Sequence, residues 1–110
     1  MDQARAQELL SEARARVEGE LAALERGGPL EGSENREPGD LGSEDLYEDE
    51  VQEGRREDLR EELAAIERAE TRLRDGTYGV SVESGEAIPD ERLELVPTAE
   101  RTVQEEERAG

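Results

Sequence analysis

The chain has 110 residues, and its 32 acidic and 14 basic side chains give a formal net charge of −18 at pH 7. With a mean hydropathy of −0.99, such a chain stays disordered unless its few apolar residues keep a strict register, and its length allows one small domain or a helical hairpin with an appendage. The negative charge disfavours unaided binding to DNA, RNA or anionic membranes, because neutralisation of phosphates supplies most nonspecific affinity for nucleic acids.

Missing residue types exclude further function classes. The chain has no Cys, His, Trp or Phe, and every basic residue is Arg. Disulfides, thiolate nucleophiles, imidazole bases, Schiff-base lysines and the common zinc ligands are therefore absent. No apolar run approaches the roughly 20 residues of a membrane span, and the N-terminus does not begin a signal peptide. We therefore expect a soluble cytoplasmic protein that is not an enzyme.

The first predicted element is a helix over residues 2–26. Its apolar residues recur every three or four positions, which places them in one narrow stripe with charged residues on the other faces. The sequence Gly27-Gly28-Pro29 ends this helix, because glycine permits a left-handed cap and proline cannot continue a helix. The stripe consists of Ala6, Leu10, Ala13, Val17, Leu21 and Leu24.

A loop rich in Gly and Pro follows over residues 27–42, and a second helix is predicted from Ser43 to about Asp75. Ser43 is a good N-cap before two acidic residues, and Gly76 provides a stop. Gly54 costs about 1 kcal/mol in a helix interior, so it weakens the first part of this helix. The apolar stripe consists of Leu46, Leu59, Leu63, Ile66 and Leu73, with Ala64, Ala65 and Ala69 beside it.

Two amphipathic stripes joined by one loop favour an antiparallel helical hairpin, or coiled coil. We therefore predict a mainly α fold with a hairpin over residues 1–75, whose tip is the loop 27–42. The alternative is an isolated acidic helical segment that becomes ordered only on a partner.

Residues 76–110 follow a different pattern. The β-prone stretch 77–82, a turn at 83–85 and a possible return at 87–88 indicate a small β-hairpin. Pro89 is expected to break the chain, and a short helix is expected from Pro97 to about Arg108. A unit of this size does not fold alone without a metal or disulfide, so it must pack against the end of the hairpin. Its expected core is Tyr78, Val80, Val82, Ile88, Leu93, Leu95, Val96 and Val103.

A specific series of residues runs through this segment: Arg72-Leu73, Gly76-Thr77-Tyr78-Gly79-Val80, Gly85-Glu86, Ile88, Arg92-Leu93-Glu94, Pro97 and Ala99. The series resembles the C-terminal half of the DksA/TraR family, bacterial zinc-finger proteins that bind RNA polymerase. The match extends over most of the chain from the loop onward, whereas the first helix matches only in type. The resemblance implies a helical hairpin followed by a zinc-finger-like unit.

The family's four zinc cysteines fall on Ser81, Ser84, Thr102 and Glu105 in this chain. Structural zinc is bound by four thiolate or imidazole ligands in a tetrahedron, and hydroxyl groups are poor zinc ligands. We therefore expect that no zinc and no other cofactor binds, and that the degenerate finger folds without metal.

The sequence Glu-Pro-Gly-Asp-Leu-Gly at residues 37–42 resembles the family's acidic hairpin tip. Glu37 stands at the family's first Asp, Asp40 at its second, and Gly42 replaces an Ala. The resemblance implies that the hairpin enters the secondary channel of RNA polymerase and brings the tip near the active-site magnesium, where a carboxylate is a suitable oxygen donor. The alternative is that Asp40 and its acidic neighbours only solvate the loop and favour the following helix N-terminus.

The resemblance implies a transcriptional regulator that binds RNA polymerase through its acidic tip, and we expect it to be a monomer that does not recognise DNA directly. Complementary charge would raise its rate of association with a basic surface. The alternative is an acidic helical interaction or scaffold module that has lost polymerase regulation. A carboxylate enzyme is a third possibility, but no pair of acids stands out as its catalytic centre. The absence of cysteine excludes a redox sensor.

Overall fold

The computed structural model describes residues 1–26 and 43–109, with side chains from residue 50 onward in the second range. It contains helices α1 (Gln3–Glu25), α2 (Ser43–Asp75), α3 (Asp90–Leu95) and α4 (Val103–Ala109). Pairing of the β type within these ranges is limited to one antiparallel bridge between Val80 and Ala87. The predicted loop 27–42, including Glu37, Asp40 and Gly42, lies outside the described residues.

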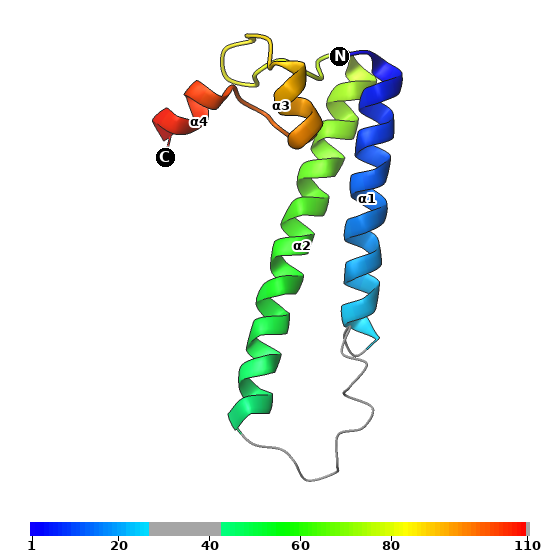
Figure 1. Ribbon diagram of the computed structural model, residues 1–110, viewed down its shortest axis with the longest axis vertical. Coiled ribbons are helices and arrows are strands. Elements are labelled where there is room, and N and C mark those ends of the chain that lie inside the picture. Colours follow the sequence, from blue (N-terminus) through cyan, green and yellow to red (C-terminus); the bar gives the residue numbers. More distant parts are fainter. Residues whose placement is uncertain (27–42, 110) are drawn as a thin grey trace. The chain divides into compact units, whose positions relative to one another are not determined.

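The chain divides into two compact units, one of Met1–Ala15 with Ala64–Gly110 and one of Arg16–Leu63. In each unit a segment of α1 is paired with a segment of α2 (Figure 1). In the first unit Arg14 forms ion pairs with Glu67 and Glu70. In the second unit, ion pairs also join residues of α1 to residues of α2. The two helices form the predicted antiparallel hairpin. Its ion pairs join Arg16 to Glu62 and Glu20 to Arg55.

The buried face of α1 confirms the predicted helical period. Ala6, Leu10, Val17 and Leu24 are buried, whereas Ala13 and Leu21 are half-buried. Leu9 is also buried, although it lies outside the predicted stripe. A stripe about 100° wide includes residues adjacent in sequence, so Leu9 and Leu10 contribute together.

The second helix has the predicted bounds and continues through Gly54. Leu59, Ile66 and Ala69 are buried. Burial of large apolar side chains such as Leu59 and Ile66 contributes about 1.5–3 kcal/mol each, which exceeds the cost of one helical glycine. The other predicted stripe residues with described side chains are half-buried, and Leu46 lies outside the described side chains. These half-buried residues are Leu63, Ala64, Ala65 and Leu73.

Local hydrogen bonds explain where α1 begins and where α2 ends. The Asp2 carboxylate accepts a hydrogen bond of 2.8 Å from the backbone N–H of Arg5, so Asp2 is the N-cap of α1. At the end of α2, Gly76 adopts a φ of 82°, and the Thr77 N–H donates to the Arg72 carbonyl at 2.8 Å. This left-handed ending is a Schellman-type cap, and it confirms the predicted glycine stop.

Two glycines of α2 and its cap provide a matched test of this geometry. Gly76→Ala should lower the free energy of unfolding by about 1–2 kcal/mol, because a side chain disfavours the left-handed conformation. Gly54→Ala should raise it by about 0.5–1 kcal/mol, because an added Cβ at this helical position meets no atom within 4 Å. Urea unfolding measures both, and a change of the same sign in the two variants would contradict the assigned backbone.

The C-terminal core is smaller than predicted. Ile88, Leu93 and Ala99 are buried together, with Met1, Tyr78 and Val96 packed partly against them. The other expected core residues are exposed; two of them lie at or beside the single bridge and the other two lie in α3 and α4. These exposed residues are Val80, Val82, Leu95 and Val103.

The helices of this segment also differ from the prediction. Pro89 does not simply break the chain: its carbonyl accepts hydrogen bonds from Arg92 and Leu93 and it begins α3. A proline at a helix N-terminus has a suitable φ and lacks only an N–H that would be unpaired there. The last helix begins at Val103, later than the predicted start at Pro97.

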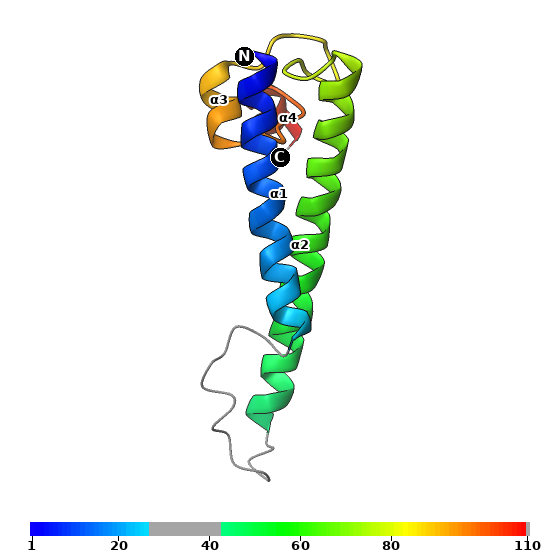
Figure 2. The same ribbon diagram turned by 90° about the vertical axis from the view of Figure 1, so that its right-hand side faces the viewer.

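The predicted domain division, 1–75 and 76–110, remains a prediction. The first compact unit combines the ends of α1 and α2 with residues 76–110, and α3 lies beside the N-terminal part of α1 (Figure 2). The C-terminal segment therefore packs against the end of the hairpin, as its small core requires.

Candidate functional site

Ion pairs attach the C-terminal segment to α2. Glu100 accepts hydrogen bonds from Arg68 at 3.2 Å and from Arg72 at 3.1 Å. The bond from Arg68 is the main cause that lowers the pKa of Glu100 below its ordinary value of 4.5. Glu100 is therefore a charged attachment point between α2 and the loop that precedes α4.

A second ion pair joins α1 to α3. The Arg5 guanidinium donates to the Glu94 carboxylate through Nε at 2.8 Å and through Nη2. This hydrogen-bonded pair lowers the pKa of Glu94 and raises the pKa of Arg5. Both side chains are partly exposed, so the pair orients α3 more than it stabilises the fold.

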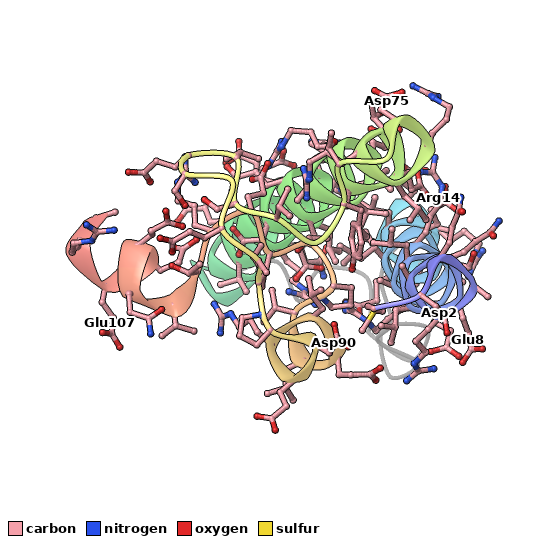
Figure 3. The ribbon with its side chains drawn as sticks, turned by 90° about the horizontal axis from the view of Figure 1, so that it is seen from above. Asp2, Glu8, Arg14, Asp75, Asp90 and Glu107 are labelled. Carbon is pink, nitrogen blue, oxygen red and sulfur yellow. The ribbon has the colours of Figure 1, made fainter. Side chains whose placement is uncertain are left out.

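Exposed acidic side chains of this unit also form ion pairs: Glu8 pairs with Arg5, and Asp90 pairs with the amino group of Met1. Figure 3 shows Glu8 on α1 and Glu107 on α4 at the outer edge of the side-chain layer. Both are exposed, and they contribute to the negative surface rather than to the core.

Neutral hydrogen bonds complete the attachment. The Tyr78 hydroxyl donates to the Pro97 carbonyl at 2.7 Å, and the Val82 N–H donates to the Glu100 carbonyl at 2.8 Å. Burial is the main cause that raises the pKa of Tyr78. Two stretches on either side of α3 are therefore held together at Tyr78 and Val82.

The positions that correspond to the family's zinc cysteines form one hydrogen-bonded group, which we call the hydroxyl–carboxylate cluster: Ser81, Ser84, Thr102 and Glu105. At the start of α4, the Thr102 N–H donates to the Glu105 carboxylate at 2.8 Å and the Glu105 N–H donates to the Thr102 hydroxyl at 3.2 Å. This reciprocal pair is a capping box, and it fixes the helix start at Val103.

The other half of the cluster is a tight turn. The Ser81 hydroxyl accepts hydrogen bonds from the N–H groups of Glu83 at 3.0 Å and Ser84 at 3.1 Å. The Gly85 N–H donates to the Ser81 carbonyl at 2.9 Å, and Gly85 has a φ of 77°. The Ser84 hydroxyl in turn accepts a hydrogen bond from the Glu86 N–H at 3.3 Å, so both serine hydroxyls stabilise the turn.

Glu105 joins the two halves. Hydrogen bonds from the Ser84 side chain, the Thr102 backbone and the Ser81 side chain lower the pKa of Glu105 from 4.5 to about 2. Glu105 is only 4% exposed, and a buried carboxylate is stable when several donors satisfy it. The carboxylate is thus ionised at neutral pH and held in place by residues from both halves.

The cluster does not match a structural zinc site. Zinc sites of this kind use thiolate or imidazole ligands, whereas the cluster has three hydroxyls and one carboxylate. The Ser81 and Thr102 oxygens already accept backbone hydrogen bonds. Among the described side chains, those of residues 1–26 and 50–109, no group of three acidic side chains is arranged to hold a metal ion.

Sequence reasoning identified these four positions only as replaced ligands and missed their hydrogen bonds. The signal was present in the sequence: Thr102 and Glu105 have the spacing of a capping box, which predicts a helix N-terminus at this point. The contact from the serine turn to Glu105 has no such local signal, because it joins residues that are distant in sequence.

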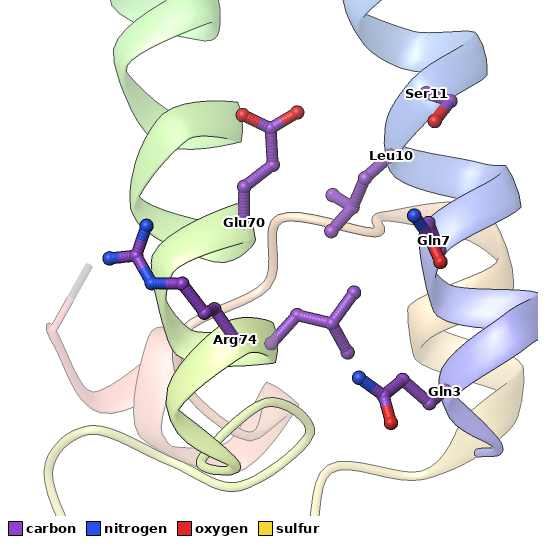
Figure 4. A pocket seen from close by; sticks show the side chains of 7 residues that line it. Gln3, Gln7, Leu10, Ser11, Glu70 and Arg74 are labelled. Carbon is purple, nitrogen blue, oxygen red and sulfur yellow. The ribbon is translucent and has the colours of Figure 1, made fainter.

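A pocket of about 370 Å³ lies between the ends of α1 and α2 in the same unit. Figure 4 shows Leu10 of α1 pointing toward α2, whereas the guanidinium of Arg74 points away from α1. Glu70 accepts a hydrogen bond from Arg14 at 2.8 Å, so it is not free to act as a base. The residues that line the pocket are Gln3, Gln7, Leu10, Ser11, Glu70, Leu73 and Arg74.

No helix in the described part of the chain is both long enough and apolar enough to cross a bilayer.

Comparison with curated proteins finds similarity to two proteins of Bacillus subtilis. The chain is 51% identical to general stress protein 16O over 45 residues and 45% identical to the uncharacterized protein YteA over 62 residues. The matches cover 28% and 26% of these proteins, so the chain spans about a quarter of the length of the curated relatives it matches. A comparison with family models finds no match.

Among solved structures, the chain is similar to the transcription factor DksA2 from Pseudomonas aeruginosa. The two share 31% sequence identity with a TM-score of 0.62, and the similarity covers 97% of this chain and 78% of DksA2. It includes both the helical hairpin and the C-terminal segment that contains the hydroxyl–carboxylate cluster. Because fold and sequence agree over nearly the whole length, the chain belongs to the DksA/TraR family, as a member in which all four zinc cysteines are replaced.

Proposed function

We propose that this chain is a transcriptional regulator that binds RNA polymerase directly and does not recognise DNA. The observation that carries the proposal is the similarity to a transcription factor over 97% of the chain. RNA polymerase is the partner that membership of the DksA/TraR family implies. Such a regulator would act in the cytoplasm as a monomer and would not catalyse a reaction.

The charge of the chain supports a protein partner over a nucleic acid. A net charge of −18 repels phosphate groups, which removes the usual nonspecific affinity for DNA. The same charge increases the rate of association with a basic protein surface. The surfaces that surround nucleic-acid channels are commonly basic, so charge favours docking near such a channel.

We further propose that Asp40 acts inside the secondary channel of the polymerase. Residues 27–42 connect α1 to α2, so Asp40 belongs to the segment that joins the two helices of the hairpin. The family resemblance assigns Asp40 to the acidic tip, where its carboxylate would contact the active-site magnesium or basic residues near it. Glu37 and Gly42 differ from the family pattern in side-chain length and in a lost methyl group, so Asp40 is the main candidate.

The experiment compares the wild type, Asp40→Ala and Glu34→Ala in polymerase binding and in transcription from several promoters. Glu34→Ala is the matched control, because it removes one charge from the same loop outside the tip pattern. We expect similar binding for all three and an effect on transcription weaker by about tenfold for Asp40→Ala alone, because the proposed tip contact acts on the promoter complex, by about 1.4 kcal/mol, and is not needed for docking. An unchanged effect of Asp40→Ala would remove the tip from the mechanism.

The second candidate is an acidic interaction module with another basic partner. It is favoured by the departures of Glu37 and Gly42 from the tip pattern and by the loss of all four cysteines. Co-purification distinguishes the two functions: a stable partner other than polymerase, with no polymerase recovered, would favour this candidate and contradict the first.

A further inference from the structure

We propose that the Glu105 carboxylate performs the structural task that a metal ion performs in a zinc finger: it ties the Ser81–Ser84 turn to the start of α4, and the C-terminal segment therefore folds without metal. This inference concerns the fold of the chain and does not depend on polymerase binding.

Burial is the first observation that supports this assignment. Among the described residues, the buried polar or charged side chains are those of Ser81, Thr102 and Glu105, which are 3%, 5% and 4% exposed. All three belong to the hydroxyl–carboxylate cluster. Burial of polar groups is unfavourable unless they are hydrogen-bonded, so their concentration at one point indicates a satisfied internal network.

The second observation is that the donors and acceptors of the cluster balance. The Ser81 oxygen accepts two backbone hydrogen bonds, which uses both of its lone pairs and leaves its proton to donate. Glu105 is buried together with Ser81, and the Ser84 and Ser81 side chains are among the causes that lower its pKa. A metal ion at the same point would have to compete with backbone N–H groups for the Ser81 and Thr102 lone pairs.

The third observation is the connectivity. In a zinc finger the metal joins two pairs of ligands from separate segments. Here one pair, Ser81 and Ser84, lies in a turn before α3, and the other pair, Thr102 and Glu105, begins α4. The Val82 N–H, next to Ser81, donates to the Glu100 carbonyl at 2.8 Å, which joins the two segments beside the cluster with a hydrogen bond. The hydroxyls of Ser84 and Ser81 also contribute to the low pKa of the buried Glu105 carboxylate.

Metal content is the first test. The purified chain should contain far less than one zinc ion per molecule, and excess EDTA should leave its melting temperature unchanged. Stoichiometric zinc, or a lower melting temperature in EDTA, would overturn the proposal.

A double-mutant cycle tests Glu105 itself. Glu105→Ala should lower the melting temperature by about 4–8 °C, whereas Glu106→Ala, which removes an exposed acid from the same first turn of α4, should change it little. The Ser84→Ala and Glu105→Ala effects should be strongly non-additive, because the two side chains share one interaction.

Two outcomes of the cycle would overturn the proposal. Equal effects of Glu105→Ala and Glu106→Ala would show that the removed charge matters and the contact does not. Additive effects of Ser84→Ala and Glu105→Ala would reduce Glu105 to a local helix cap. In Glu105→Gln the amide oxygen can still accept a hydrogen bond from the Thr102 N–H. This variant should therefore fold, with a melting temperature between those of the wild type and Glu105→Ala.

A quadruple variant tests whether the positions keep their arrangement. With Cys at all four cluster positions, the chain should bind one zinc ion, and EDTA should then lower its melting temperature. A folded quadruple variant that binds no zinc would contradict the correspondence between the cluster and a zinc site.

Discussion

Replacement of Leu93 by Ala should lower the free energy of unfolding by about 2–5 kcal/mol, the range for large-to-small changes in a protein core. Leu93 is 1% exposed and forms the C-terminal core with Ile88 and Ala99. A core of so few residues cannot close around the cavity. The loss should therefore release residues 76–109 from the hairpin, which amide hydrogen exchange would detect as faster exchange in α3 and α4.

Leu95→Ala is the matched control for this prediction. Leu95 lies in the same helix with the same side chain, but it is 81% exposed. Its replacement should change the free energy of unfolding by less than about 0.5 kcal/mol. Equal destabilisation by the two variants, measured by urea unfolding, would show that the C-terminal core is not the one described.

Lowering the pH should remove the part of the unfolding free energy that depends on an ionised Glu105 carboxylate. Hydrogen bonds from Ser84, Thr102 and Ser81 lower the pKa of Glu105 to about 2 in the folded chain, against 4.5 for an ordinary Glu. A depressed carboxyl pKa stabilises the folded state above the unfolded value, and this contribution falls as the pH drops from about 4.5 towards 2. The lowered pKa values of Glu94 and Glu100 act in the same direction.

Comparison of the wild type with Glu105→Gln separates the contribution of the Glu105 carboxylate from the other effects of pH on the unfolding free energy. Protonation of the other carboxylates also relieves the repulsion of the net charge of −18, so the total change with pH has opposing parts. The difference in unfolding free energy between wild type and Glu105→Gln should be constant above about pH 5 and should shrink towards pH 2. A difference that stays constant throughout would contradict an ionised Glu105 in the cluster.

Much of the fold follows from local sequence signals. The periods of Ala6, Leu10 and Val17 predict α1, and the Ser43 and Gly76 signals give both ends of α2. These predictions are accurate because each depends on residues within a few turns of one another. The burial of Leu59 and Ile66 also outweighs the weak helix propensity of Gly54, so α2 continues through it.

The C-terminal segment was harder to predict because its structure depends on contacts between distant residues. Val80 and Val82 have high β propensity, but without a partner strand they remain exposed around a single bridge. Pro89 begins a helix because its carbonyl is used and its missing N–H is not needed. The contacts of Arg68 with Glu100 and of Ser84 with Glu105 likewise have no local pattern in the sequence.

We expect that this family member, which lacks the zinc cysteines, still binds RNA polymerase. The most direct test is to purify the wild-type chain in EDTA, to remove the chelator, and then to measure binding of the chain to core RNA polymerase. We expect this EDTA-treated chain to bind saturably, with one chain per polymerase. A folded chain that shows no binding to polymerase would contradict the account.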